Sequence, residues 1–157
     1  MKADGISGSV THSGYEGWIE LKHIDFTGII QNIEHVVGRM NNRVSSFPTF
    51  GQVEIFKSVD ESSLKLFQAA CGAKVIPTVQ IDFVTSADPG FTFESIELSN
   101  MIFSRYQEAH FQGAQLPVER LNLHYTEIQK TYYPRGADNT VGAPQRAGYD
   151  LASGQTL

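Results

Sequence analysis

The chain has 157 residues, enough for a single domain to bury a hydrophobic core without disulfide bridges, and its one cysteine excludes an internal bridge. The formal net charge of -5 argues against binding to a nucleic-acid backbone, which requires clustered Lys and Arg. No segment has the apolar core of a secretion signal or the length to span a bilayer. The charged fraction of 18% is low for a free-standing soluble monomer.

The first third of the chain favours strands followed by a long loop. Strands are predicted over Ile6–Val10 and Trp18–His23, with a polar connection between them. The segment Asp25–Val37 is rich in β-branched residues but lacks a regular period. Gly38–Pro48 is polar, rich in turn-forming residues and long for a hairpin, so we expect an extended loop of the kind that commonly carries function. Trp18 is more typical of a core or subunit-interface anchor than of a ligand-stacking residue.

A short helix is predicted between two strands in the middle of the chain. A strand over Gln52–Val59 leads to Asp60, whose carboxylate is placed to cap the first helical turn. Gly72 is expected to end the helix in the left-handed conformation. Residues at helical spacing predict one apolar face that would pack on the core: Leu64, Phe67, Ala70 and Cys71.

Strands dominate the remainder of the chain. Val79–Phe83 alternates apolar and polar residues, as a half-buried strand does, and Asp88-Pro89-Gly90 predicts a turn. Between Phe93 and Ile96 the apolar residues switch from one set of alternating positions to the other, which indicates a β-bulge near Glu94–Ser95.

The last third is expected to contain one long strand and a loop-rich tail. Val118–Tyr133 is predicted as a strand in which the alternation of apolar and polar residues shifts by one position near Glu127–Ile128. The tail over 134–157 is rich in Gly, Ala, Pro and Asn, and only Ala147–Leu151 is suited to a final short strand. Several long strands, two phase slips and one helix predict a mainly β domain over 1–157. Its expected architecture is an antiparallel β-barrel of two packed sheets with one short flanking α-helix and an extended loop.

Catalytic and metal-binding patterns are not found in the sequence. There is no phosphate-binding glycine loop and no Gly-x-Ser-x-Gly motif. The histidines lack metal-ligand spacing and are scattered at His12, His23, His35, His110 and His124. Glu94 and Glu97 form a weak candidate pair, better explained as solvated strand residues. We therefore expect no enzyme activity, no metal and no cofactor.

The ordered set of motifs resembles the haemolysin-coregulated protein (Hcp) family, the tube subunit of bacterial type VI secretion systems. No single motif is diagnostic, but the set follows the family's order over nearly the whole chain. The matching segments are Asp4–Val10, Gly17–Leu21, Ser58–Phe67, Val79–Phe83, Ile96–Ile102, Leu121–Tyr132 and Ala147–Asp150.

The resemblance implies a structural protein that assembles with itself. It implies a homohexameric ring, rings stacked into a hollow tube, and expulsion of that tube with a spike protein by a contractile sheath. Effector proteins would be carried in the lumen. The chain would thus be cytoplasmic and then secreted without a signal peptide, with neither nucleic-acid binding nor membrane insertion.

The resemblance also implies two groups of functional residues. The family's protruding loop, which contacts the neighbouring ring, corresponds here to Gly38, Arg39, Met40, Asn41, Asn42, Arg43, Val44, Ser45, Ser46 and Phe47. After Trp18, the family often has a small polar residue facing the lumen where this chain has Asp25. His23 and Asp25 are therefore the candidate lumen or cargo-facing residues, and a carboxylate at Asp25 departs from the usual serine.

Two other functions fit the same strand pattern. A phage-type or contractile-particle tail tube protein would share the architecture. A small-molecule-binding β-barrel would instead be monomeric, with an apolar lumen sealed by side chains.

Overall fold

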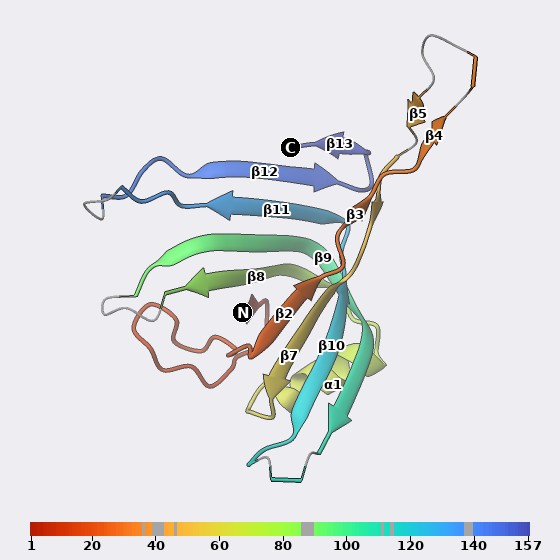
Figure 1. Cartoon of the computed structure of the whole chain (residues 1–157). Helices are drawn as coiled ribbons and strands as arrows, with labels where there is room; N and C mark the ends of the chain where they lie inside the picture. The colour runs from red at the N-terminus through yellow and green to blue at the C-terminus, as the bar shows by residue number, and fades with distance from the viewer. Residues whose placement is uncertain are drawn as a thin grey trace.

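The computed structural model describes residues 1–35, 37–38, 43–45, 47–85, 90–110, 112–113, 115–136 and 140–157, with the backbone alone at 34–35 and 43–45. The described chain forms a curled antiparallel sheet of nine strands, two small ribbons and one helix (Figure 1). Its elements are β1 Lys2–Ala3, β2 His23–Phe26, β3 Ile29–Ile30, β4 Ile33–His35, β5 Arg43–Ser45, β6 Thr49–Phe50, β7 Val53–Ser58, α1 Ser63–Cys71, β8 Ile76–Val84, β9 Thr92–Ala109, β10 Val118–His124, β11 Glu127–Tyr132, β12 Gln145–Asp150 and β13 Gln155–Thr156.

The curled sheet has two halves that share the long strand β9. The first part of β9 pairs with β8 and β11, and these continue to β1 on one side and to β12 and β13 on the other. The last part of β9 pairs with β10, which is followed by β7 and β2. We call this second part, β9–β10–β7–β2, the four-stranded half. The result is a half-barrel, which confirms the predicted mainly β architecture with one short helix.

The sheet turns its corner at Asn100 and Thr126. Asn100 adopts a left-handed backbone conformation (φ 51°), which Asn tolerates better than most residues, and its side-chain amide donates a hydrogen bond to Thr126 Oγ1 at 3.1 Å. Opposite this corner, Tyr125 and Thr126 separate β10 from β11. The single strand predicted over Val118–Tyr133 is therefore two strands, and its phase slip lies at the corner.

A bulge does occur in the first part of β9, slightly before the predicted position. Phe83 pairs with Glu94 but Val84 pairs with Thr92, which leaves Phe93 as the extra residue. Phe93 is accordingly 38% exposed, whereas Ile96 further along the strand is buried. The predicted turn at Asp88-Pro89 lies outside the described residues.

The two N-terminal strands predicted from the sequence are not strands. Only His23 of the segment Trp18–His23 lies in a strand, and Ile6 makes only an isolated bridge to Ala3. The two segments still approach closely, because the Gly8 N–H donates to the Gly17 carbonyl at 2.8 Å. A Cβ at Gly8 would lie 2.4 Å from the Trp18 carbonyl oxygen, so this approach requires glycine.

The helix ends differ in detail from the predicted caps. The N-cap residue is Ser62, and the Asp60 carboxylate accepts its N–H at 2.9 Å while the Asp60 N–H donates to Ser63 Oγ at 2.9 Å. Ser63, three residues after Asp60, thus accepts the backbone N–H that a glutamate accepts in a capping box. The left-handed residue at the other end is Ala73 (φ 47°), not Gly72 (φ -89°).

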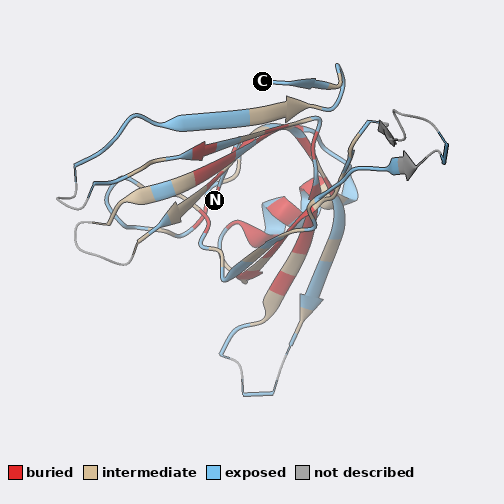
Figure 2. Ribbon diagram, turned by 45° about the horizontal axis from the view of Figure 1, so that its top comes forward, coloured by how far each residue is buried: buried red, intermediate tan, exposed pale blue. Residues whose placement is uncertain are grey.

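The helix buries a different side from the one predicted, although Ala70 of the predicted face does pack against the core. Ser63, Leu66 and Ala69 face the sheet, whereas Leu64 is 77% exposed and Phe67 is 49% exposed (Figure 2). Cys71 is also exposed. The prediction failed for two reasons. Both sides of this helix carry apolar residues, so their spacing alone does not select one side. The hydrogen-bond partner of Ser63 also lies on the sheet, which places the Ser63 side of the helix inward. The strand core around it consists of Val53, Ile55, Ile76, Val79, Ile81, Ile96, Leu98, Met101, Phe103, Leu121, Leu123 and Ile128.

An arm built from the ribbons β3–β6 and β4–β5 projects from the half-barrel (Figure 1). The predicted extended loop is therefore partly ribbon, since Arg43, Val44 and Ser45 form β5. Gly38 adopts φ 87°, and the Phe47 side chain is 77% exposed. The remaining predicted loop residues lie outside the described ones: Arg39, Met40, Asn41, Asn42 and Ser46.

The C-terminal tail adds strands to the edge of the sheet. The strand predicted over Ala147–Leu151 is β12, which begins two residues earlier, at Gln145, and ends at Asp150. It pairs with β11 along its whole length, and β13 follows on its outer side.

Candidate functional site

One face of the four-stranded half is polar and faces away from the core. Two rows of neighbouring residues cross its strands on this side. One row is Asp25, Glu54, Asn122 and Arg105, and the other is His23, Phe56, Arg120 and Gln107. We call these eight residues the open face; Glu54 and Asn122 within it are buried by their neighbours. Both predicted cargo-facing residues, His23 and Asp25, lie on it and are exposed.

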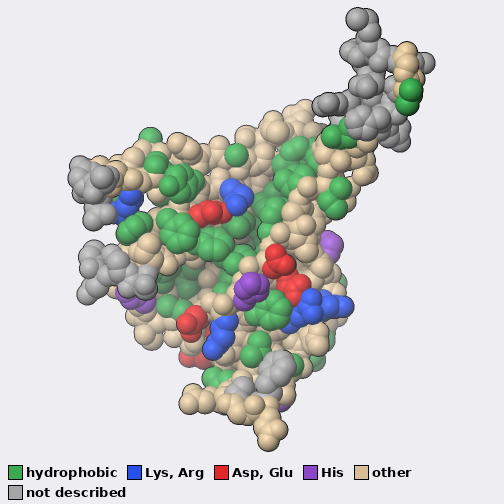
Figure 3. All heavy atoms as spheres, in the orientation of Figure 1, with side chains coloured by type: hydrophobic (Ala, Val, Ile, Leu, Met, Phe, Trp, Pro, Cys, Tyr) green, Lys and Arg blue, Asp and Glu red, His purple; other side chains and the backbone are tan. Residues whose placement is uncertain are grey.

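The centre of the open face is an aromatic ring with cationic and acidic neighbours. The His23 ring lies 5.5 Å from the Phe56 ring, and the Arg120 guanidinium lies 5.6 Å from the centre of the same ring. Arg120 Nη2 also donates to Glu54 Oε2 at 2.9 Å, and this hydrogen bond raises the pKa of Arg120. Figure 3 shows acidic, basic and histidine side chains gathered over β2 and β7.

The formal charges on the open face balance. Asp25 and Glu54 offset Arg105 and Arg120, whereas the whole chain carries -5. The face itself therefore adds no net charge to the field set by the rest of the chain. Its side chains offer hydrogen-bonding groups and one aromatic ring.

The two edges of the four-stranded half are unlike and unpaired. Within the part of the chain that the structure describes, no strand pairs with the outer edge of β2, and β8 pairs with β9 only as far as Met101. Because each neighbouring pair in the half is antiparallel, β2 and the last part of β9 run in opposite directions. The β9 edge of one copy could therefore pair with the β2 edge of a second copy in antiparallel fashion.

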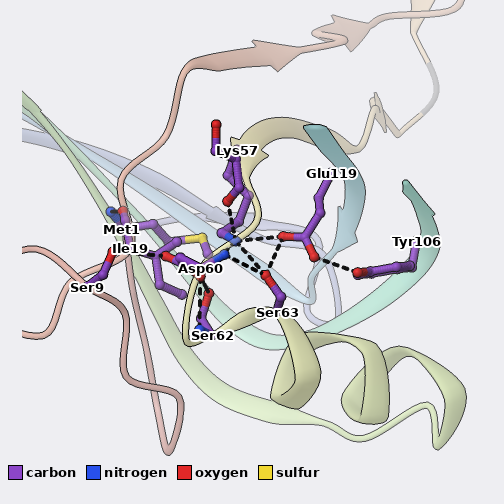
Figure 4. A network of polar contacts seen from close by, with 10 residues as sticks. Met1, Ser9, Ile19, Lys57, Asp60, Ser62, Ser63, Tyr106 and Glu119 are labelled. Carbon is purple, nitrogen blue, oxygen red and sulfur yellow. Dashed lines mark hydrogen bonds and ion pairs between the residues drawn. The ribbon is translucent and has the colours of Figure 1, made fainter. Parts of the chain in front are cut away.

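A buried polar network attaches α1 to the other side of this half (Figure 4). Lys57 Nζ lies 2.6 Å from Glu119 Oε2 and 2.8 Å from Asp60 Oδ1, and it donates to the Ser58 carbonyl at 2.8 Å. Glu119 also accepts from Ser63 Oγ at 3.0 Å and from the Tyr106 hydroxyl at 2.5 Å. Sequence reasoning missed this network, because Lys57, Ser63, Tyr106 and Glu119 come from β7, α1, β9 and β10, which are separate in the chain.

The network shifts the pKa of two of its members. Burial alone would raise the pKa of Asp60, but hydrogen bonds from Lys57 and Ser62 and the Lys57 charge outweigh it and lower that pKa. Burial, with the hydrogen bond to Glu119 and its charge, raises the pKa of Tyr106 above its usual range. Asp60 therefore stays ionised and Tyr106 neutral over the ordinary pH range.

The weak carboxylate pair considered from the sequence is not an acid–base pair. Glu94 forms an ion pair with Lys130 at 2.6 Å, and Glu97 lies three residues further along β9 on the other side of the strand. Across the described residues, no group of three or more His, Cys, Asp or Glu side chains is placed to hold a metal ion. No helix of the described chain is long and apolar enough to cross a membrane.

Comparison with known proteins identifies one family. The model for "Type VI secretion system effector, Hcp" matches residues 1–132 of the chain. A search of curated proteins finds no match.

Solved structures share the fold. A structure described as a type six secretion system protein has a TM-score of 0.91 at 22% identity, covering 99% of this chain and 96% of the other. Hcp1 from Salmonella typhimurium gives 0.75 at 17% identity, covering 99% and 95%. A type VI secretion system effector from Yersinia pestis gives 0.73 at 16% identity, covering 95% and 96%.

Proposed function

The chain belongs to the Hcp family of type VI secretion system proteins, and we propose that it assembles into the rings of that system's tube. The family consists of structural tube proteins without catalytic activity, which confirms the prediction that the chain is not an enzyme. The resemblance inferred from the ordered motifs is likewise confirmed. Six copies would form a ring, and rings would stack.

The two unpaired edges of the four-stranded half are the observation that carries this proposal. An edge with free N–H and C=O groups is a template for pairing with another chain. Here the β2 edge and the β9 edge differ in sequence and run in opposite directions. Joining unlike edges gives a heterologous contact, which closes into a ring when the rotation permits. A continuous antiparallel sheet would then line the ring.

The open face supports a role for that lining in transport. With the helix and the core on the opposite side of the sheet, the ring would close with the open face directed into the lumen. His23 and Asp25 would then face cargo, alongside Phe56 and Arg120. We propose that this polar, charge-balanced surface contacts effector proteins carried inside the ring.

The arm is proposed as the axial contact between rings. It projects well beyond the sheet (Figure 1), and Phe47, between β5 and β6, exposes its aromatic ring. A second contact, separate from the sheet edges, is needed to stack rings into a tube. The partners of the assembled tube would be the spike protein, the contractile sheath and effectors, and the tube would be exported from the cytoplasm.

Light scattering coupled to size exclusion tests the assembly directly. A mass of six subunits supports the proposal, and electron micrographs should show rings with a central hole. A monomer at high protein concentration would contradict it.

That monomer would favour the second candidate, a small-molecule-binding barrel. The observation in its favour is a groove of about 480 Å³ between the N-terminal segment, β2 and β8, lined by both apolar and charged residues. A phage-type tail tube would assemble in the same way as the proposed ring, but the family model places the chain with type VI secretion proteins.

A further inference from the structure

We propose that the exposed apolar side of α1 packs into the groove beside β2 of the next copy in the ring. This inference rests on the proposed ring and specifies the contact that would hold it together. The β2–β9 pairing would supply backbone hydrogen bonds on the lumen side. The helix and the groove would supply apolar burial behind it.

The helix presents an apolar stripe formed by Leu64, Phe67 and Cys71. Leu64 is 77% exposed, Phe67 is 49% exposed, and Cys71 is exposed. These residues recur at helical spacing and therefore lie on one side of α1. The Phe67 ring packs edge-on against Tyr106 of β9, 5.4 Å between centres. The stripe therefore adjoins the last part of β9, whose edge is unpaired.

The groove lies at the other end of the same sheet. The N-terminal segment and β8 form its walls, and β2 lies along it. Aromatic and aliphatic side chains from both walls line it, and Figure 3 shows hydrophobic side chains in this recess. Its lining also includes five polar residues: His12, Glu20, Lys22, Asp82 and His23, the last of which is shared with the open face. The apolar members used below are Tyr15, Trp18, Leu21, Ile24, Phe83 and Val84.

The strand register places the stripe and the groove at the same level of the sheet. Tyr106, Leu121, Ile55 and Ile24 are neighbours in one row across β9, β10, β7 and β2. Phe67 lies against the first residue of this row, and the groove includes the last. If the β9 edge of one copy pairs with the β2 edge of the next, the stripe approaches the groove.

A second copy explains both surfaces at once. A different partner on the helix would leave the groove open, and a ligand in the groove would leave the stripe exposed. In a ring, the rotation that relates one copy to the next brings the stripe of each copy to the groove of its neighbour. Every copy then covers one stripe and one groove, as a heterologous ring contact requires.

Cross-linking through Cys71 tests the contact, because it is the only cysteine in the sequence. Leu21→Cys and Val84→Cys, made separately, place a second thiol on either wall of the groove. Purified single rings are treated with a short bifunctional maleimide and analysed on denaturing gels. We expect a ladder of covalent multimers from at least one of these variants, and its loss when Cys71→Ser is added.

Leu151→Cys is the matched control, since Leu151 is 37% exposed and Val84 is 36% exposed. Leu151 follows β12 and does not line the groove, so this variant should give no ladder. Rings that give no ladder from either groove variant would overturn the helix–groove contact and leave the ring itself standing. Monomers in the unmodified protein would overturn both proposals.

A second experiment removes the stripe itself. Leu64→Ser combined with Phe67→Ser should shift the unmodified ring peak to monomers at the same protein concentration, with a monomer that still unfolds cooperatively. Tyr132→Ser is the control, because Tyr132 is 50% exposed on β11. Rings that survive the double substitution unchanged would contradict the proposal, whatever the cross-linking gives.

Discussion

The ammonium group of Lys57 lies 2.6 Å from the carboxylate of Glu119, and neither side chain is exposed to solvent. This pair joins β7 to β10 beneath α1, and the hydroxyls of Ser63 and Tyr106 complete its hydrogen bonds. Removing two charges from water is costly, and this cost is offset only when geometry and additional hydrogen bonds are good. Both conditions hold here, so the pair specifies how the helix sits on the sheet.

Breaking this pair should destabilise the fold strongly. Lys57→Ala leaves the Glu119 carboxylate buried without its cation, which costs about 3–5 kcal/mol of unfolding free energy. Urea unfolding followed by circular dichroism measures the loss. The double variant Lys57→Met, Glu119→Leu should lose less than the single variant, because no unpaired charge remains. A loss below about 1 kcal/mol for Lys57→Ala would mean that the site relaxes to admit water.

The stability of the protein should fall at acid pH partly through Asp60. Its pKa is lowered in the folded protein, so its contribution is present above the unfolded pKa of about 4 and is lost as pH falls through the folded value. Asp60→Asn should therefore lower the melting temperature at neutral pH and flatten its decline in acid. Asp25→Asn, on an exposed strand position, serves as the control. Parallel acid profiles for Asp60→Asn and the unmodified protein would contradict the assignment.

The close approach at Gly8 should tolerate no side chain. A Cβ there would lie 2.4 Å from the Trp18 carbonyl oxygen and 2.7 Å from the Ile19 Cα, so backbone must move. We expect Gly8→Ala to cost about 1–3 kcal/mol in thermal or urea unfolding, as overpacking does. Ser13→Ala, at an exposed position of the same segment, should change stability little. Equal stabilities for the two variants would show that the N-terminal segment is not held against Trp18.

Shortening the arm should separate ring formation from stacking. Deleting 41–46 removes β5 from the arm without touching either edge of the four-stranded half. We expect the light-scattering mass of a ring to persist while filaments become rare in electron micrographs. Filaments as long and as frequent as those of the unmodified protein would contradict the proposal that the arm joins one ring to the next.

Changing the open face should alter cargo without altering the ring. Asp25→Ala leaves Glu54 facing Arg105 and Arg120, so the face gains net positive charge. Rings should form normally, because the side chain points away from the core. Effectors that co-purify with the rings, quantified by mass spectrometry, should change in amount or identity. An unchanged set of bound proteins would remove Asp25 from the cargo surface.

Local patterns predicted most of the strands and the place of the helix. Alternation in Val79–Phe83 gave most of β8, and the phase change after Phe93 indicated a bulge close to the observed one. The N-terminal strands failed for a physical reason. Glycines at Gly8 and Gly17 allow the backbone to turn and approach closely there, and such contacts outweigh the strand preference of single residues.

The sequence by itself determined a mainly antiparallel fold, one capped helix near Asp60, a long projecting segment and the ordered motifs of a family. These are local properties, fixed by residues within a few positions of one another. Tertiary structure decided which side of α1 is buried. Leu64 and Leu66 are equally apolar, but Ser63 hydrogen-bonds Glu119, 56 residues away, and that contact turns Leu66 inward. It also decided that β2 and β9 end the four-stranded half, with edges that no other described strand pairs, because strand order depends on how distant segments pack.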